Sequence, residues 1–99
     1  MIGTGARNSF FGSEGADQMI GGRGRNYVLY EDSDAAVTVD LEQGKGSGGH
    51  AEGDTYQDIN NVVGSAYDDT LIGNQHRNTL TGGDGADTLD GGEGNDTLG

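Results

Sequence analysis

The sequence contains no cysteine, no proline and no tryptophan, and only five of its 99 residues are lysine or arginine. The absence of cysteine excludes disulfide bonds and thiolate metal sites. No apolar run approaches the length of about 20 residues that a membrane-spanning helix requires, and no signal-peptide pattern is present. A net charge of −12 makes nucleic acid and anionic membranes poor partners for the surface.

Apolar residues are also scarce, because only 30% of the chain is hydrophobic. Burial of so little apolar surface hardly offsets the conformational entropy lost on folding. The 17 carboxylates repel one another in a compact state until cations neutralise them. We therefore expect bound metal ions to contribute to folding.

Glycine is abundant, with 21 copies, and its placement is periodic. Residues 82–99 read GGDGADTLD and then GGEGNDTLG, two copies of a nine-residue unit. Glycine at the first, second and fourth positions allows positive φ and turns carbonyl groups to one side. With the aspartate at the sixth position, these carbonyls predict an all-oxygen site that suits Ca²⁺ better than Mg²⁺ or Zn²⁺. The last three residues predict a short strand with its middle side chain inward.

Degenerate copies of the unit occupy residues 64–72 and 73–81, and a second array covers residues 3–11, 12–20 and 21–29. The eighth position is apolar in all seven units, which predicts a continuous inward stripe. The seven residues are Phe10, Met19, Val28, Leu71, Leu80, Leu89 and Leu98.

Residues 30–63 break the glycine pattern but keep strand character, since Val37, Val39 and Leu41 alternate as a half-buried strand does. Counting in nines places Val37 at an eighth position, and Val62 at another. The glycine-rich stretch 44–54 is interpreted as a flexible surface loop or as a non-standard calcium loop using Glu52 or Asp54.

The nonapeptide resembles the calcium-binding repeat of the RTX, or haemolysin-type, family. The resemblance implies an all-β fold, a right-handed parallel β-roll (β-solenoid) with two nonapeptides per turn. We expect one domain over residues 1–99, with an N-terminal array (3–29), an irregular β insert that continues the roll (30–63) and a C-terminal array (64–99). The last repeat has no capping element, so we expect the chain to be an excerpt of a larger protein.

The resemblance also implies a ligand set, because in this family each calcium ion lies between two stacked loops. It takes backbone carbonyls and the sixth-position aspartates of both loops. Applied here, the loop 64–69 stacks on the loop 82–87. The expected ligands are the carboxylates of Asp69 and Asp87 and the carbonyl groups of Ser65, Tyr67, Gly82 and Asp84.

A weaker site is expected on the opposite edge, where only Asp96 supplies a sixth-position carboxylate. The residues expected to face one another there are Asn74, His76 and Asn78 with Gly91, Glu93 and Asp96.

The N-terminal array is expected to differ between its edges. Asn8 stacks with Asn26 beside Arg7 and Arg25, so that edge is expected to lack calcium. Asp17 is expected to face the segment 31–34, where Asp32 and Asp34 complete an acidic site.

If the insert fills whole turns, asparagines gather on one edge and aspartates on the other. Asn side chains both donate and accept, so a stacked ladder can satisfy turn backbone without metal. The expected asparagine column is Asn8, Asn26, Asn60 and Asn78, and the expected aspartate column is Asp17, Asp69 and Asp87.

Catalytic interpretations are disfavoured. His50 and His76 lack a metal-site or triad context and are interpreted as exposed loop residues. The glycine loops are not followed by a helix, as a phosphate-binding loop would be. The periodic carboxylates are explained by metal rather than by a glycosidase pair.

We therefore expect a non-enzymatic, secreted module that folds on binding several extracellular Ca²⁺ ions and stabilises its parent protein. The resemblance to the RTX family implies export by type I secretion. The alternative is a polysaccharide-binding or adhesive module, and ice binding through outward threonines ranks lower. Outward apolar residues at ninth positions predict contact with adjacent domains of the parent or with a second copy. They are Phe11, Ile20 and Leu29, with Tyr27 beside them.

Overall fold

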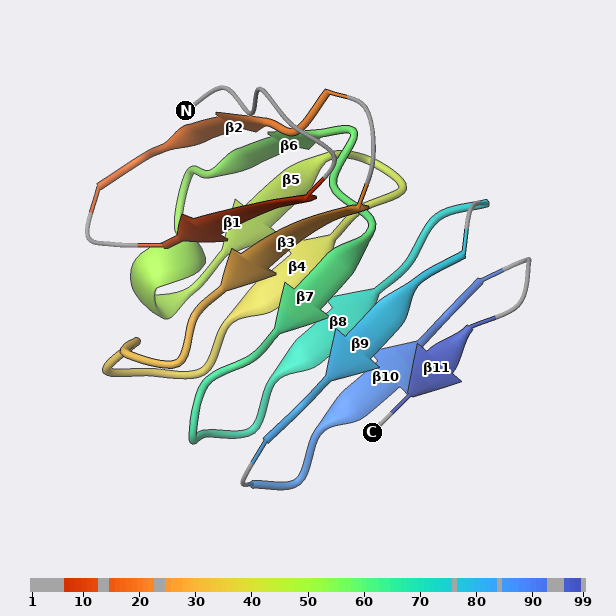
Figure 1. Cartoon of the computed structure of the whole chain (residues 1–99). Coiled ribbons are helices and arrows are strands. Elements are labelled where there is room, and N and C mark those ends of the chain that lie inside the picture. Colours follow the sequence, from red (N-terminus) through yellow and green to blue (C-terminus); the bar gives the residue numbers. More distant parts are fainter. Residues whose placement is uncertain are drawn as a thin grey trace.

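The computed structural model describes residues 7–12, 15–22, 25–75, 77–83, 85–92 and 96–98, which form two facing β-sheets (Figure 1). Within these residues the only helical element is a single 3-10 turn, η1 (Gly49–Ala51), and no helix is long and apolar enough to cross a membrane. The all-β fold of short, mostly parallel strands is the β-roll that the sequence predicts.

The five-stranded sheet is parallel throughout, and successive neighbours are joined by a segment that passes through the other sheet. Its strands lie in front in Figure 1. In spatial order they are β1 (Arg7–Phe11), β3 (Arg25–Leu29), β7 (Asn61–Val63), β9 (Thr79–Thr81) and β11 (Thr97–Leu98).

The six-stranded sheet contains one antiparallel strand, β5, between two parallel groups. In spatial order its strands are β2 (Gln18–Ile20), β6 (Thr55–Gln57), β5 (Lys45–Ser47), β4 (Thr38–Asp40), β8 (Thr70–Ile72) and β10 (Thr88–Asp90).

Eighth-position side chains stack in register and form the core between the sheets. Because alternate residues of a strand face opposite sides, one side chain per unit points inward. In the five-stranded sheet Phe10 aligns with Val28, Val28 with Val62, and Val62 with Leu80. In the other sheet Met19 aligns with Tyr56, and Val39 and Leu89 both align with Leu71. All of these are buried except Leu89, which is partly buried against the cluster.

The insert does not simply continue the roll. The chain leaves β4, turns back as antiparallel β5 and returns as β6, so that β6 rather than β4 is the neighbour of β2. Val39 aligns with Leu71, and the expectation that Val37 holds the eighth position is therefore wrong. Val62 does hold that position.

The interpretation of residues 44–54 as a flexible surface loop is also wrong, because they form β5 and η1. Gly46 aligns with Val39 and faces the Tyr56 ring. A Cβ at Gly46 would lie 2.2 Å from the Tyr56 hydroxyl, so only glycine leaves room for that side chain. The antiparallel strand therefore depends on a small residue at its inward position.

The loops that join the sheets form two edges, which we name by their sixth-position residues. Strand register aligns Asp17 with Asp54 on the first edge, and Asn26 with both Asn8 and Asn60 on the second. The aspartate edge consists of the loops containing Asp17, Asp54, Val37, Asp69 and Asp87, and the asparagine edge of those containing Asn8, Asn26, Asn60, Asn78 and Asp96.

Candidate metal centre at the stacked loops

The loop 82–87 stacks directly on the loop 64–69 at the aspartate edge, as predicted. The main-chain nitrogen of Asp69 donates a 2.8 Å hydrogen bond to Asp87 Oδ1. One residue earlier, the main-chain nitrogen of Ala86 donates to Asp68 Oδ1 at 2.7 Å. Two carboxylates therefore join the loops from opposite directions and hold them in register.

Backbone carbonyls of one loop lie against glycines of the next. A Cβ at Gly83 would lie 3.0 Å from the Ser65 carbonyl oxygen, and one at Gly85 would lie 2.6 Å from that of Tyr67. Both glycines have positive φ, 76° and 97°, which L side chains rarely adopt. The glycines thus allow the carbonyls of Ser65 and Tyr67 to approach the next loop closely.

Asp69 and Asp87 differ although they occupy equivalent positions. The carboxylate of Asp69 is 1% exposed and accepts hydrogen bonds from the main-chain nitrogens of Val37 and Ser65 and from the Ser65 hydroxyl, at 2.9, 2.8 and 2.6 Å. Asp87 is only half-buried, and the one hydrogen bond its carboxylate accepts within the described part of the chain is that from Asp69. Of these two sixth-position aspartates, Asp87 is therefore the one whose carboxylate has coordination capacity left.

The asparagine edge repeats this arrangement at its C-terminal end. The main-chain nitrogen of Asn78 donates to Asp96 Oδ1 at 2.8 Å, and a Cβ at Gly92 would lie 3.1 Å from the Asn74 carbonyl oxygen. The carbonyl of Gly91 lies against Gly73 in the same way. Three expected ligands, His76, Asp84 and Glu93, lie outside the described residues.

A common rule connects these contacts. A sixth-position carboxylate accepts a hydrogen bond from the main-chain nitrogen of the sixth-position residue in the loop stacked before it. The pairs, donor first, are Asp17 and Asp54, Val37 and Asp69, Asp69 and Asp87, and Asn78 and Asp96.

Amides replace carboxylates along the rest of the asparagine edge, as predicted. The Asn8 side chain donates to Asn26 Oδ1 at 2.8 Å, and Asn26 donates to the Asp58 carbonyl at 3.0 Å. Further along, Asn78 donates to the Asn60 carbonyl at 2.8 Å and to Asn74 Oδ1 at 3.1 Å. Asn26 and Asn78 are fully buried, so the ladder satisfies turn backbone with protein groups alone.

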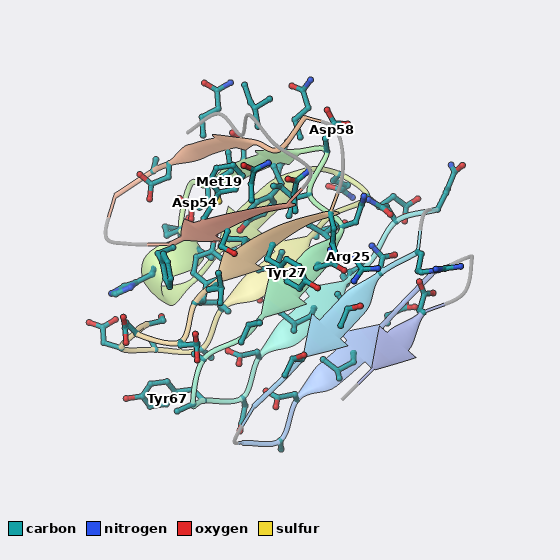
Figure 2. All side chains as sticks on the ribbon, in the orientation of Figure 1. Met19, Arg25, Tyr27, Asp54, Asp58 and Tyr67 are labelled. Carbon is teal, nitrogen blue, oxygen red and sulfur yellow. The ribbon has the colours of Figure 1, made fainter. Side chains whose placement is uncertain are left out.

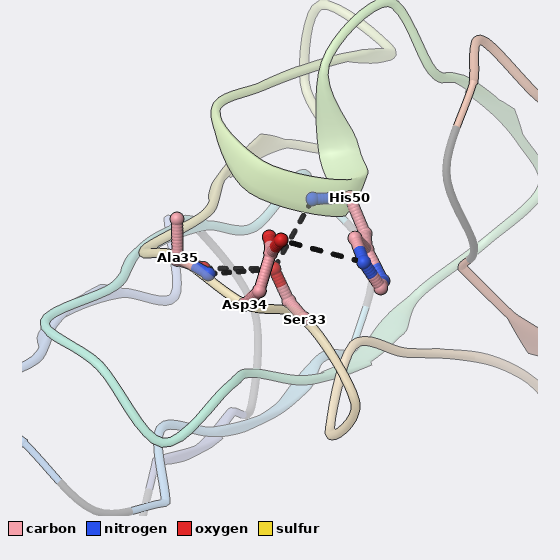
Figure 3. A network of polar contacts seen from close by, with 4 residues as sticks. All are labelled: Ser33, Asp34, Ala35 and His50. Carbon is pink, nitrogen blue, oxygen red and sulfur yellow. Dashed lines mark hydrogen bonds and ion pairs between the residues drawn. The ribbon is translucent and has the colours of Figure 1, made fainter.

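The expected acidic site of Asp17 with Asp32 and Asp34 is wrong. Asp17 aligns with Asp54, because the insert places β6 and β5 between β2 and β4. The segment 31–34, which the nine-residue period placed opposite Asp17, lies instead beside η1. There Asp34 is 3.9 Å from His50 Nε2, and Ser33 Oγ accepts from the His50 main-chain nitrogen at 3.1 Å (Figure 3).

His50 is not an exposed loop residue, which corrects a second expectation. Its side chain is 15% exposed, and its Nδ1 is buried without a hydrogen-bond partner among the described residues. The residue is covered because η1 folds over the turn that follows β3, an arrangement that depends on the insert.

The sequence analysis missed a buried cluster of hydroxyl and carboxyl groups. The Tyr30 hydroxyl donates to Asp54 Oδ2 at 2.5 Å and lies 2.6 Å from the Tyr56 hydroxyl. Burial raises the pKa of Tyr30 and of Tyr56. Burial also raises the pKa of Asp54, although the hydrogen bonds from Tyr30 and from the Asp17 main chain oppose this. Asp54 is buried, whereas Tyr67 projects from the aspartate edge (Figure 2).

The donor chemistry fits a hard cation at the C-terminal loops. Among the described residues, no three Asp, Glu or His side chains gather closely enough to hold a metal ion by themselves. An ion between the loops 64–69 and 82–87 would therefore take most of its oxygens from backbone carbonyls and one carboxylate from Asp87. Ca²⁺ accepts such mixed, irregular oxygen sets, while Mg²⁺ requires a near-ideal octahedron.

Two stacked sheets joined by glycine-rich loops, with carbonyls and aspartates facing one another, define a calcium-binding β-roll. The model of the RTX calcium-binding nonapeptide repeat matches residues 1–29, 54–79 and 63–98. The chain belongs to this family, and as an RTX repeat module it is a calcium-binding protein. No curated protein matches the chain.

Proposed function

We propose that this module folds when it binds Ca²⁺ outside the cell and thereby stabilises a larger secreted protein. The observation that carries the proposal is the stacking of two loops in a chain of net charge −12. The Asp87 carboxylate binds the Asp69 main chain, and the carbonyls of Ser65 and Tyr67 lie against glycines of the loop that contains Asp87. Without a cation this edge concentrates negative charge and carbonyl dipoles, which opposes compaction. A bound cation removes that opposition.

Two gaps between loops are proposed to hold calcium. In the first, Asp87 supplies the carboxylate, and Ser65, Tyr67 and Gly82 supply carbonyls, with Asp84 as a further ligand. Asp69 acts there mainly through its main chain, because its carboxylate is already bound by Val37 and Ser65.

The second gap lies at the asparagine edge, between the loops 73–78 and 91–96. Its carboxylate is Asp96, and the carbonyls of Asn74 and Gly91 face the stacked glycines. Asn78, His76 and Glu93 complete this proposed site.

The mechanism is thermodynamic linkage. An ion that binds the folded roll and not the unfolded chain adds about 2.7 kcal/mol at a hundred times its dissociation constant. Extracellular calcium modules have dissociation constants of roughly 10⁻⁴–10⁻³ M. The C-terminal loops would thus stay open at cytosolic calcium levels and close after export. Secretion by the type I route and a non-catalytic role within the parent protein belong to the same proposal.

Polysaccharide binding stays a prediction that no contact favours. The exposed large apolar side chains among the described residues are Phe11 and Tyr67. Phe11 lies on β1 of the five-stranded sheet, and Tyr67 lies on a loop of the aspartate edge. They do not form the row of aromatic platforms that a sugar chain would need.

Calcium titration followed by circular dichroism tests the proposal. The β signal should increase with Ca²⁺ and saturate, whereas Mg²⁺ at equal concentration should have little effect because it tolerates irregular coordination poorly. Asp87→Asn should shift the midpoint to higher calcium. An identical spectrum in excess chelator and in excess Ca²⁺ would show that calcium does not control folding of any part of the chain.

A further inference from the structure

We propose that the N-terminal half of the roll, including the insert, folds without calcium, because the juxtaposition of Tyr30, Asp54 and Tyr56 replaces a metal ion with protein groups. We call these three residues and the main chain of Asp17 the buried junction. The inference deepens the proposed function, on which it rests, by dividing the chain into a permanently folded part and a calcium-dependent part.

Asp54 occupies a sixth position of the aspartate edge although no complete nonapeptide precedes it. Its Oδ1 accepts a 2.6 Å hydrogen bond from the Asp17 main chain, the same contact that Asp87 makes with Asp69. The difference lies in the other oxygen, because Asp54 Oδ2 accepts the Tyr30 hydroxyl at 2.5 Å. Both oxygens of this carboxylate are therefore bound by protein groups.

The junction connects segments that are distant in sequence. Tyr30 follows β3, Asp54 precedes β6, Tyr56 lies within β6, and Asp17 precedes β2. Exposed fractions of 0% for Tyr30, 1% for Asp54 and 8% for Tyr56 place the hydrogen bonds away from water. Buried polar groups that satisfy one another fix a single packing arrangement, since any slip leaves a costly unpaired group.

Tyr30 and Tyr56 of the junction belong to the apolar core. Enclosed side chains of the N-terminal strands and the insert are part of the same cluster, whereas Leu89 on β10 is only partly buried. Burial of apolar surface contributes stability that does not depend on calcium. The enclosed side chains between the N-terminal strands and the insert are Met19, Val28, Val37, Val39, Ala51 and Ile59.

The side chain of Asp17, beside the junction, suggests an alternative in which a cation binds there. Asp17 Oδ2 is buried and has no hydrogen-bond partner among the described residues. A cation held by this oxygen would make the junction metal-dependent. Calcium-dependent protection of β2 and β6 would reveal such an ion, so the experiment has to resolve individual strands.

Hydrogen–deuterium exchange of the whole 99-residue chain, read by mass spectrometry of peptides, resolves the two parts. We expect the amides of β2, β3, β6 and β7 to exchange slowly in excess chelator and equally slowly in excess Ca²⁺. Amides of β10 should exchange at least tenfold faster in chelator than in Ca²⁺. Slow exchange throughout the chain in chelator would instead contradict the proposed calcium-triggered function.

Fast exchange of every strand in chelator would overturn the buried-junction proposal and leave calcium-triggered folding intact. Protection of β2 and β6 that appears only with Ca²⁺ would overturn it as well, and would assign a cation to Asp17. The two failures are thus distinguishable from a failure of the proposed function.

Tyr30→Phe removes only the hydroxyl that binds Asp54 and should accelerate exchange of β2, β3 and β6 in chelator several-fold. Thr55→Val is the matched control, because it removes an exposed hydroxyl from the first residue of β6, directly after Asp54 in the sequence. Asp54→Asn keeps the shape of the side chain and should act like Tyr30→Phe. This second variant tests the same hydrogen bond if Tyr30→Phe does not fold. Exchange as slow as in the unsubstituted chain for both variants would refute the role of the junction.

Discussion

The main-chain nitrogen of Asp69 donates a hydrogen bond to Asp87 Oδ1, whereas the carboxylate of Asp69 turns to the preceding loop and binds the Val37 main chain. Two aspartates at equivalent repeat positions therefore have different tasks. Asp69 closes its own loop and supports the turn before it. Asp87 accepts one hydrogen bond from the stacked loop and keeps coordination capacity beyond it.

Asp87→Asn should raise the calcium concentration at half-folding several-fold. The substitution removes an anionic ligand but preserves an oxygen that can accept from the Asp69 main chain. In chelator the free energy of unfolding should rise only slightly, because one repelling charge is lost. Calcium titrations monitored by circular dichroism give the midpoint.

Asp69→Asn should instead lower stability with and without calcium. The Asp69 carboxylate accepts three hydrogen bonds, and the NH₂ group of asparagine would face at least one of these donors and could not accept from it. Hydrogen bonds to a charged group each contribute about 1.5–3 kcal/mol. Urea unfolding in saturating Ca²⁺ measures this loss. Equal shifts of the calcium midpoint for the two variants, with no loss of stability for Asp69→Asn, would contradict the division of tasks.

Gly85→Ala should weaken calcium-dependent folding much more than Gly15→Ala. Both glycines have similar positive φ, 97° and 92°, so alanine introduces similar backbone strain at each. The difference is steric, because a Cβ at Gly85 would lie 2.6 Å from the Tyr67 carbonyl oxygen while one at Gly15 meets nothing within 4 Å. The comparison of calcium midpoints isolates the effect of separating Gly85 from the Tyr67 carbonyl. Equal midpoints would show that backbone strain alone determines the effect.

Much of the fold could be predicted because the repeat supplies its own register. The inward stripe at eighth positions aligns Phe10 with Val28 and Leu71 with Leu89, as a period of nine with two units per turn requires. In the insert, Val37 and Val39 both suit an inward position by alternation. Register there is set by Tyr56 packing over Gly46, a contact between distant residues that no local pattern contains.

The candidate site was predictable to the same extent. The nine-residue spacing located the loops 64–69 and 82–87, and the resemblance to the RTX family implied their stacking, but both treated Asp69 and Asp87 as equivalent. The distinction follows from Ser65, a hydroxyl residue where the repeat has its second glycine, which binds the Asp69 carboxylate. One local signal for the buried junction was present, since Gly49 and Asp54 have the spacing of first and sixth positions.

Asn26→Ala should destabilise the chain by a similar amount with and without calcium. The buried Asn26 side chain accepts from Asn8 and donates to the Gly22 and Asp58 carbonyls, and alanine removes all three hydrogen bonds. Each such hydrogen bond contributes about 0.5–1.5 kcal/mol. Urea unfolding at saturating Ca²⁺ and in chelator gives the two values. A calcium midpoint that moves as far as in Asp87→Asn would mean that the asparagine edge binds calcium there too.

High pH should unfold the module through its buried phenols. Burial first, and then the neighbouring Asp54 and Tyr56, raise the pKa of Tyr30 above the ordinary value of 10.0, and burial raises that of Tyr56. Because the folded-state pKa values exceed the unfolded ones, this contribution to stability is complete below pH 10 and is lost as pH rises further. Each phenol lowers the free energy of unfolding by about 1.4 kcal/mol per pH unit in that range.

Simultaneous recording of tyrosinate absorbance and circular dichroism in saturating Ca²⁺ tests this linkage. The absorbance of Tyr30 and Tyr56 should appear together with the loss of the β signal, because burial raises the pKa of both phenols in the folded chain. Tyr56→Phe should remove part of the absorbance change that coincides with unfolding and leave the remainder. If all four tyrosines of the chain ionised while the β signal persisted, water would have access to the Tyr30 hydroxyl, and the hydrogen bonds around Asp54 could not be the feature that holds the N-terminal half together.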